Sequence, residues 1–174
     1  MQESQTISSP IRIARIAAAL GALIVLGGWR DISPVDRVKD TKVWAFAVRA
    51  PQTVQFAGQT IAADFVMGCI KETYDGRPLQ LGSYVQFTRR VAAFAKGEYR
   101  FDQREVQEFR SAGGDDTGYR ISIGRQYTSV EYAALLSSVS RLRLQAELVT
   151  GFSFFEFNLK KANDILAKLP CRPH

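Results

Sequence analysis

Histidine is almost absent from this chain: of its 174 residues, only His174 is a histidine, at the very end of the sequence. Serine and cysteine triads, histidine-ligated zinc sites and the HExxH motif all need a histidine held inside a packed site. The sequence therefore argues against these catalytic classes. Carboxylate-only catalysis stays possible, because five acids cluster in the sequence: Asp102, Glu105, Glu108, Asp115 and Asp116. Because Arg100 and Arg104 are interleaved with these acids, solvated charges are the favoured interpretation.

Phosphate and calcium motifs are also lacking. The stretch GGDDTG at 113–118 has neither the Lys-Ser/Thr ending of a P-loop nor the alternating oxygen ligands of an EF-hand, so a surface turn is favoured. The formal net charge is +6, but the basic residues are scattered and no nucleic-acid recognition motif accompanies them. We therefore expect no cofactor, no metal site and no nucleic-acid partner.

No apolar run is long enough to span a membrane comfortably. The candidate is IAAALGALIVLGG at 16–28, which follows Arg12 and Arg15 but falls short of the roughly 20 residues that a spanning helix needs. A basic segment before an apolar run is typical of a signal peptide and of an uncleaved membrane anchor, and both alternatives stay open for residues 1–29. Either one predicts a body that is periplasmic, anchored to the inner membrane or secreted after signal cleavage.

The remainder has the composition of one globular domain, with 46% hydrophobic and 23% charged residues. The stretch at 30–40 is polar, surrounds Pro34 and lacks periodicity, which predicts a linker. We therefore expect a single exported domain at 41–174.

Cysteine is scarce, and Cys69 and Cys171 are the only two. In an oxidising compartment such a pair forms a disulfide, whereas in the cytosol the two would stay buried thiols. Because the N-terminal segment predicts export, the disulfide is favoured. It would stabilise the fold by roughly 4 to 5 kcal/mol in the chain-entropy model and would hold the end of the chain against a strand.

Segments with alternating hydrophobicity make up most of the remaining sequence, and this pattern is typical of half-buried strands. The clearest is RLRLQAELV at 141–149; Gly151 separates it from a second alternating segment at 152–159. Apolar residues at helical spacing then extend to 169, before Pro170. This end of the chain therefore predicts a hairpin followed by a short helix.

Other strands are expected at 41–50, 64–72, 79–87, 98–102 and 119–124, and the stretch at 53–61 predicts either a short strand or a hairpin around Gly58. We expect Pro51 to end the first of these, a hairpin turn at 74–77, and either strand or helical turn at 103–110. A capping box from Thr128 to Glu131 predicts the start of a helix. The pattern predicts a mainly β fold: an antiparallel β-sandwich or partly closed barrel with two short helices, preceded by an N-terminal hydrophobic helix.

The last predicted strand carries two pairs of phenylalanines on opposite sides. Phe155 and Phe157 lie on one side and Phe152 and Phe154 on the other, so one pair can be exposed, although aromatics at this period more often belong to a core. An exposed pair would suit a partner subunit or a membrane surface. The candidate partner or ligand surface consists of Phe152, Phe154, Arg100 and Asp102.

Four short motifs follow one another along the chain: SPVDRVKDTKVW at 33–44, FVMGCI at 65–70, YRFD at 99–102 and FEFNLKKANDILAKLPC at 155–171. In this order they resemble the TagO/VasI-like family of periplasmic proteins associated with type VI secretion. The corresponding family motifs are a Ser-Pro-x-Asp opening, a strand with a central cysteine, an Arg-x-Asp strand and a closing segment with a terminal cysteine. The resemblance implies an exported β-sandwich domain with a role in a secretion assembly.

The resulting hypothesis is a non-enzymatic, exported or membrane-anchored β-domain that binds a protein of a cell-envelope or secretion assembly. One alternative is a domain that binds a ligand or an envelope polymer, which a deep apolar pocket would favour. The other is a carboxylate-dependent hydrolase, which requires Asp102 and Glu105 to converge in a cleft.

Overall fold

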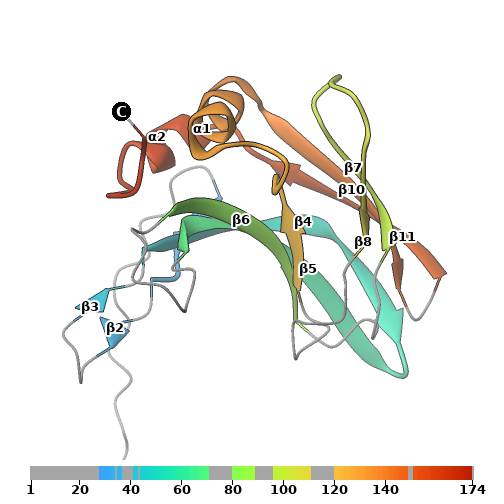
Figure 1. Ribbon diagram of the computed structural model, residues 1–174. Coiled ribbons are helices and arrows are strands. Elements are labelled where there is room, and N and C mark those ends of the chain that lie inside the picture. Colours follow the sequence, from blue (N-terminus) through green and yellow to red (C-terminus); the bar gives the residue numbers. More distant parts are fainter. Residues whose placement is uncertain are drawn as a thin grey trace, which may run out of the picture.

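The computed structural model describes residues 28–33, 35–36, 41–42, 44–70, 80–88, 96–110, 120–148 and 151–173 (Figure 1). A five-stranded antiparallel sheet contains, in spatial order, β1 (Trp29–Asp31), β4 (Ala45–Phe56), β5 (Gln59–Ile70), β6 (Gln80–Phe87) and β9 (Arg120–Ile123). A four-stranded antiparallel sheet contains β11 (Gly151–Asn158), β10 (Arg141–Leu148), β7 (Lys96–Phe101) and β8 (Gln107–Arg110). Among the described residues, the short strands β2 (Val35–Asp36) and β3 (Thr41–Lys42) pair with each other and not with either large sheet.

The expected mainly β fold is confirmed. Its two large sheets are antiparallel and separate, and the described strands form no closed barrel. Two short helices, α1 (Ser129–Ser138) and α2 (Ala162–Leu166), lie side by side at one end of the molecule (Figure 1). No helix within the described ranges combines the length and the apolar character needed to cross a bilayer.

The core lies between the two sheets. Phe65 of β5 and Phe157 of β11 have ring centroids 6.2 Å apart, and Phe87 of β6 and Phe155 of β11 are 5.6 Å apart. All four rings are at most 1% exposed. Since burying a side chain of this size contributes roughly 1.5 to 3 kcal/mol, these pairs hold the sheets face to face.

The strand β4 differs from the expectation, because it continues through Pro51 to Phe56. The pairing of β4 with β5 shifts register between Arg49 and Thr53, and Pro51 lies within this irregular part. Proline lacks the N–H that a regular ladder needs, so a bulge can accept it inside a strand. The prediction that Pro51 ends the strand was therefore wrong.

The polar stretch before residue 41 also contributes to the body. Trp29–Asp31 form β1, which pairs with β4, and the Trp29 side chain is only 1% exposed. The Trp29 indole Nε1 donates a hydrogen bond of 3.2 Å to the backbone carbonyl of Lys160. The domain thus includes residues that the sequence assigned to the leader and the linker, because a strand this short shows no periodicity.

Three other expectations have clear outcomes. The stretch at 103–110, which allowed strand or helix, forms the strand β8 at its end. The capping box is confirmed, since Glu131 N donates to Thr128 Oγ1 and Thr128 N donates to Glu131 Oε2. The helix expected up to residue 169 is shorter, because Lys161 has a left-handed φ of 73° before α2 and turns follow Leu166.

Some predictions lie outside the described residues. These are the N-terminal hydrophobic helix, the hairpin turn at 74–77 and the loop at 113–118.

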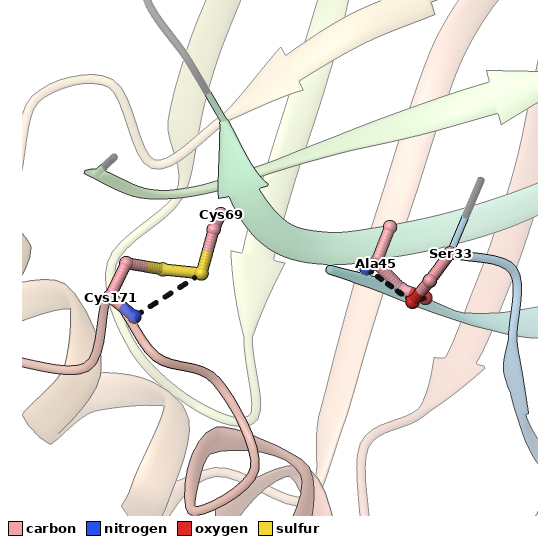
Figure 2. Close-up of a disulfide and its surroundings, with 4 residues drawn as sticks. All are labelled: Ser33, Ala45, Cys69 and Cys171. Atoms are coloured by element: carbon pink, nitrogen blue, oxygen red, sulfur yellow. Dashed lines mark hydrogen bonds between the residues drawn. A yellow bond between two sulfur atoms is a disulfide. The ribbon is translucent and has the colours of Figure 1, made fainter. Parts of the chain in front are cut away.

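The predicted disulfide is confirmed: Cys69 of β5 is bonded to Cys171, five residues after α2 in the chain, with an S–S distance of 2.07 Å (Figure 2). The Cys171 N–H also donates to Cys69 Sγ, at 3.3 Å. Figure 2 also shows how Ser33 is hydrogen-bonded to the same sheet. Ser33 Oγ accepts a hydrogen bond from Ala45 N at 3.0 Å and donates one to Ala45 O at 3.2 Å. Both contacts tie chain-terminal parts of the domain to the five-stranded sheet.

Candidate functional site

The outward side of the four-stranded sheet carries exposed apolar side chains. Phe152 and Phe154 of β11 are 65% and 49% exposed, and Val106, just before β8, is 47% exposed. Phe155 and Phe157 on the same strand are fully buried, so the alternation of the strand sends one aromatic pair into the core and the other outward. We call Phe152, Phe154 and Val106, with the outward residues between them, the phenylalanine face.

The strand register brings residues from distant parts of the sequence into one row. Phe154 lies opposite Gln145, Gln145 lies opposite Glu98, and Glu98 lies opposite Glu108. The row therefore crosses all four strands from β11 to β8. Directly opposite residues have Cβ atoms roughly 4.5 to 5.5 Å apart, so these side chains form a continuous surface.

Two shallow hollows lie on the phenylalanine face and share Glu98 and Gln145. Phe152 borders the first, which has a volume of about 240 Å³ and also touches Glu108. Phe154 borders the second, of about 200 Å³, together with Arg100. Both are smaller than the roughly 300 to 1,000 Å³ of typical small-molecule sites, so their size suits side chains of a partner better than a whole ligand.

Some of the charged side chains on the phenylalanine face form ion pairs with each other. Glu156 accepts from Arg143 Nε at 3.0 Å and lies 3.5 Å from Arg141 Nε, and Lys96 Nζ lies 2.9 Å from Glu147. Arg100, Glu98 and Glu108 have no ion pair with any part of the chain that the structure describes. Glu98 and Glu108 are also directly opposite each other, an arrangement that destabilises a sheet unless a cation neutralises it.

Three of the four predicted surface residues thus share this face, and the fourth does not. Asp102 follows β7 in a left-handed conformation, with φ of 47°, and its carboxylate accepts hydrogen bonds from Ser140 N at 3.0 Å and Ser140 Oγ at 3.1 Å. Asp102 N donates to the carbonyl of Arg141 at 3.0 Å. Asp102 therefore connects the end of β7 to the start of β10, which gives its carboxylate a structural role.

The sequence alone did not single out Glu98, Gln145 or Val106, and it marked Glu108 only as one acid of the cluster at 102–116. They are ordinary polar and apolar residues in separate segments, and only the pairing of the strands makes them neighbours. The alternation around Phe152 and Phe154 was the available signal, and it identified these two aromatic residues.

The structure places the candidate acids of a hydrolase in different environments. Asp102 is held by Ser140, whereas Glu105 is exposed and has no ion pair among the described residues. Over the same ranges, no group of three or more histidine, cysteine, aspartate or glutamate residues is placed to hold a metal ion.

No protein-family model, curated protein or solved structure matches this chain. The resemblance to the TagO/VasI-like family therefore stays a prediction from the sequence motifs.

Proposed function

We propose that the chain is a non-enzymatic, exported or membrane-anchored β-domain that binds another protein of a cell-envelope or secretion assembly through the phenylalanine face. The observation that carries the proposal is the exposure of Phe152 and Phe154 on a rigid sheet, next to two side-chain-sized hollows. Exposed apolar patches rimmed by polar residues are typical of protein interaction sites. Aromatic anchors of this kind contribute much of the binding energy at interfaces.

The unpaired charges define the chemistry of the partner. Glu98 and Glu108 favour a basic side chain beside Phe152, while Arg100 favours an acidic one beside Phe154. We therefore propose a partner segment with apolar residues for the two hollows, flanked by one basic and one acidic residue. Electrostatic complementarity of this kind fixes the register of a complex more than its affinity.

The disulfide supports the proposed compartment. Structural disulfides persist in oxidising spaces such as the periplasm and are rare in the cytosol. A periplasmic location, with a membrane contact through the N-terminal segment, agrees with the basic and apolar pattern at 12–28 and with the TagO/VasI-like motifs.

Photocrosslinking in cells tests the proposal. We expect p-benzoylphenylalanine at position 154 to give one discrete adduct with another protein, whereas the same group at position 130, where Val130 is 61% exposed on α1, gives none. Adding Phe152→Ser to the position 154 probe should reduce the adduct at least tenfold, because an interface aromatic typically contributes more than about 1.4 kcal/mol.

The crosslinking results that would contradict the proposal differ from the expected one. The same adducts from both positions, no adduct at 154, or an adduct only with a second copy of this chain would contradict a specific partner on the phenylalanine face. Phe152 is 65% exposed, so its replacement leaves the core intact and a lost adduct cannot be attributed to unfolding.

A further inference from the structure

A cavity of about 410 Å³ lies where β6, β9 and the start of α1 meet, on the other large sheet from the phenylalanine face. Its volume falls within the roughly 300 to 1,000 Å³ of small-molecule sites, unlike the two hollows described above. Its walls combine tyrosine rings with hydroxyl, amide and guanidinium groups. The cavity therefore has the size and mixed polarity of a site for one small polar molecule.

The polar side chains at the base of the cavity already have hydrogen-bond partners within the protein. The hydroxyls of Ser83 and Tyr132 are hydrogen-bonded to each other, Ser83 Oγ donates to the carbonyl of Ile123 at 3.3 Å, and both side chains are at most 4% exposed. Burial raises the pKa of the Tyr132 hydroxyl, and the hydrogen bond to Ser83 offsets this only in part, so Tyr132 stays neutral. The Tyr127 ring stacks on Tyr132, with centroids 5.9 Å apart and an interplanar angle of 7°.

The charged side chains that line this cavity are two arginines. Arg120 and Arg125 both line it, and none of the described residues that line it is acidic. Neither guanidinium has an ion pair within the ranges that the structure describes. The guanidinium carbon of Arg120 lies 4.8 Å from the centroid of the Tyr84 ring, an arrangement that positions the charge and leaves the N–H edge for a hydrogen-bond acceptor. The nearest acid on α1, Glu131, is engaged by the backbone and hydroxyl of Thr128, each at 2.9 Å.

We propose that this cavity binds a small sugar acid or sugar phosphate, with its oxyanion on Arg120 and Arg125. Guanidinium groups bind carboxylate and phosphate through paired hydrogen bonds. The hydroxyls of Ser122 and Ser129 can bind the hydroxyls of a sugar ring, and Tyr84 and Tyr127 line the same cavity. The site is independent of the phenylalanine face, because the two lie on different sheets and share no residue.

Titrations of the full chain followed by ¹⁵N NMR test this site. Glucuronate and glucose 6-phosphate should give saturable shifts of the amides of Gly82, Ser122 and Gly124, whereas glucose at the same ionic strength should give none. Arg120→Gln and Arg125→Gln should each weaken binding about tenfold or more, because a hydrogen bond to a charged group contributes roughly 1.5 to 3 kcal/mol. Arg172→Gln removes the same charge away from the cavity and should leave the affinity unchanged.

A tetragalacturonate probe identifies the source of the ligand. Tighter binding than glucuronate would indicate the end of an acidic polymer, and equal binding would indicate a free sugar acid. Absence of saturable shifts with every charged probe, equal shifts with glucose, or unchanged affinity in both cavity variants would overturn the proposal. The arginines are exposed, so these variants keep the fold.

Discussion

Asp64 of β5 is held by Arg49 of the adjacent strand β4 and by Arg30 of β1, on the far side of β4. Arg30 Nη2 donates to Asp64 Oδ1 at 2.7 Å, and Arg49 donates through Nε to Oδ1 at 3.0 Å and through Nη2 to Oδ2 at 2.8 Å. The Asp64 side chain is only 15% exposed, and burial alone raises the pKa of its carboxyl. The hydrogen bonds and charges of Arg49 and Arg30 outweigh this and lower the pKa below its usual value. The ionised carboxylate thus contributes to folding.

We predict that Asp64→Asn lowers the free energy of unfolding at pH 7 by about 1 to 2 kcal/mol, since the arginines are partly solvated and their attraction is screened. A lowered folded-state pKa gives stability that is present above the unfolded pKa, near 4, and is lost as the pH falls through the folded value. Urea denaturation from pH 7 to pH 2 should therefore show the advantage of the wild type shrinking below about pH 4. A difference that stays constant over this range would refute the role of the charge.

Residue chemistry explains which single positions the sequence could predict. The capping pair Thr128 and Glu131 acts over three residues, so its spacing is visible in the chain. Asp64 and Arg30 meet only through strand pairing, and Asp102 meets Ser140 across 38 residues. No local pattern marks such contacts.

Whole elements were predictable where alternation is long. The strands β10 and β11 lie within one residue of the expected ranges, because each alternates over eight residues. The strand β1 and the passage of β4 through Pro51 were missed. One is too short to show a period, and the other depends on a bulge that forms only against β5.

The anchoring of β1 can be tested at Trp29. Trp29→Ala should destabilise the domain by about 3 to 5 kcal/mol, because it leaves a cavity in the core and removes the hydrogen bond to Lys160. Trp29→Phe retains much of the ring contact with Phe65, at 6.1 Å, and should lose clearly less. Chemical denaturation of both variants gives the comparison, and equal stability of Trp29→Ala and wild type would show that β1 is not part of the folded body.

At the scale of the molecule, the sequence predicted the class of fold but not which faces meet. The sheet order places β7 between β10 and β8, although β10 follows β7 by some 40 residues in the chain. That order creates the phenylalanine face from four separate segments. The same topology brings β9 beside β6 and forms the proposed sugar-acid cavity. No motif in the sequence predicted this cavity.

The disulfide is the link between the shape of the molecule and its proposed compartment. It joins residues 102 positions apart, and closing a loop of this length contributes roughly 4 to 5 kcal/mol in the chain-entropy model. It also holds the segment after α2 against β5, beside the hydrogen bond from Cys171 N to Cys69 Sγ. We therefore propose that the domain is exported and that the Cys69–Cys171 disulfide forms in the compartment where it works.

Thiol trapping in intact cells tests that claim most directly. Cells of the native host are quenched in acid, and the free thiols are blocked with iodoacetamide in denaturant at pH 8. The intact mass of the purified protein is then measured before and after reduction followed by a second alkylation. We predict no alkylated cysteine before reduction and two after it. Two alkylated cysteines before reduction would mean that Cys69 and Cys171 are thiols in the cell, and would contradict both the bond and the oxidising compartment.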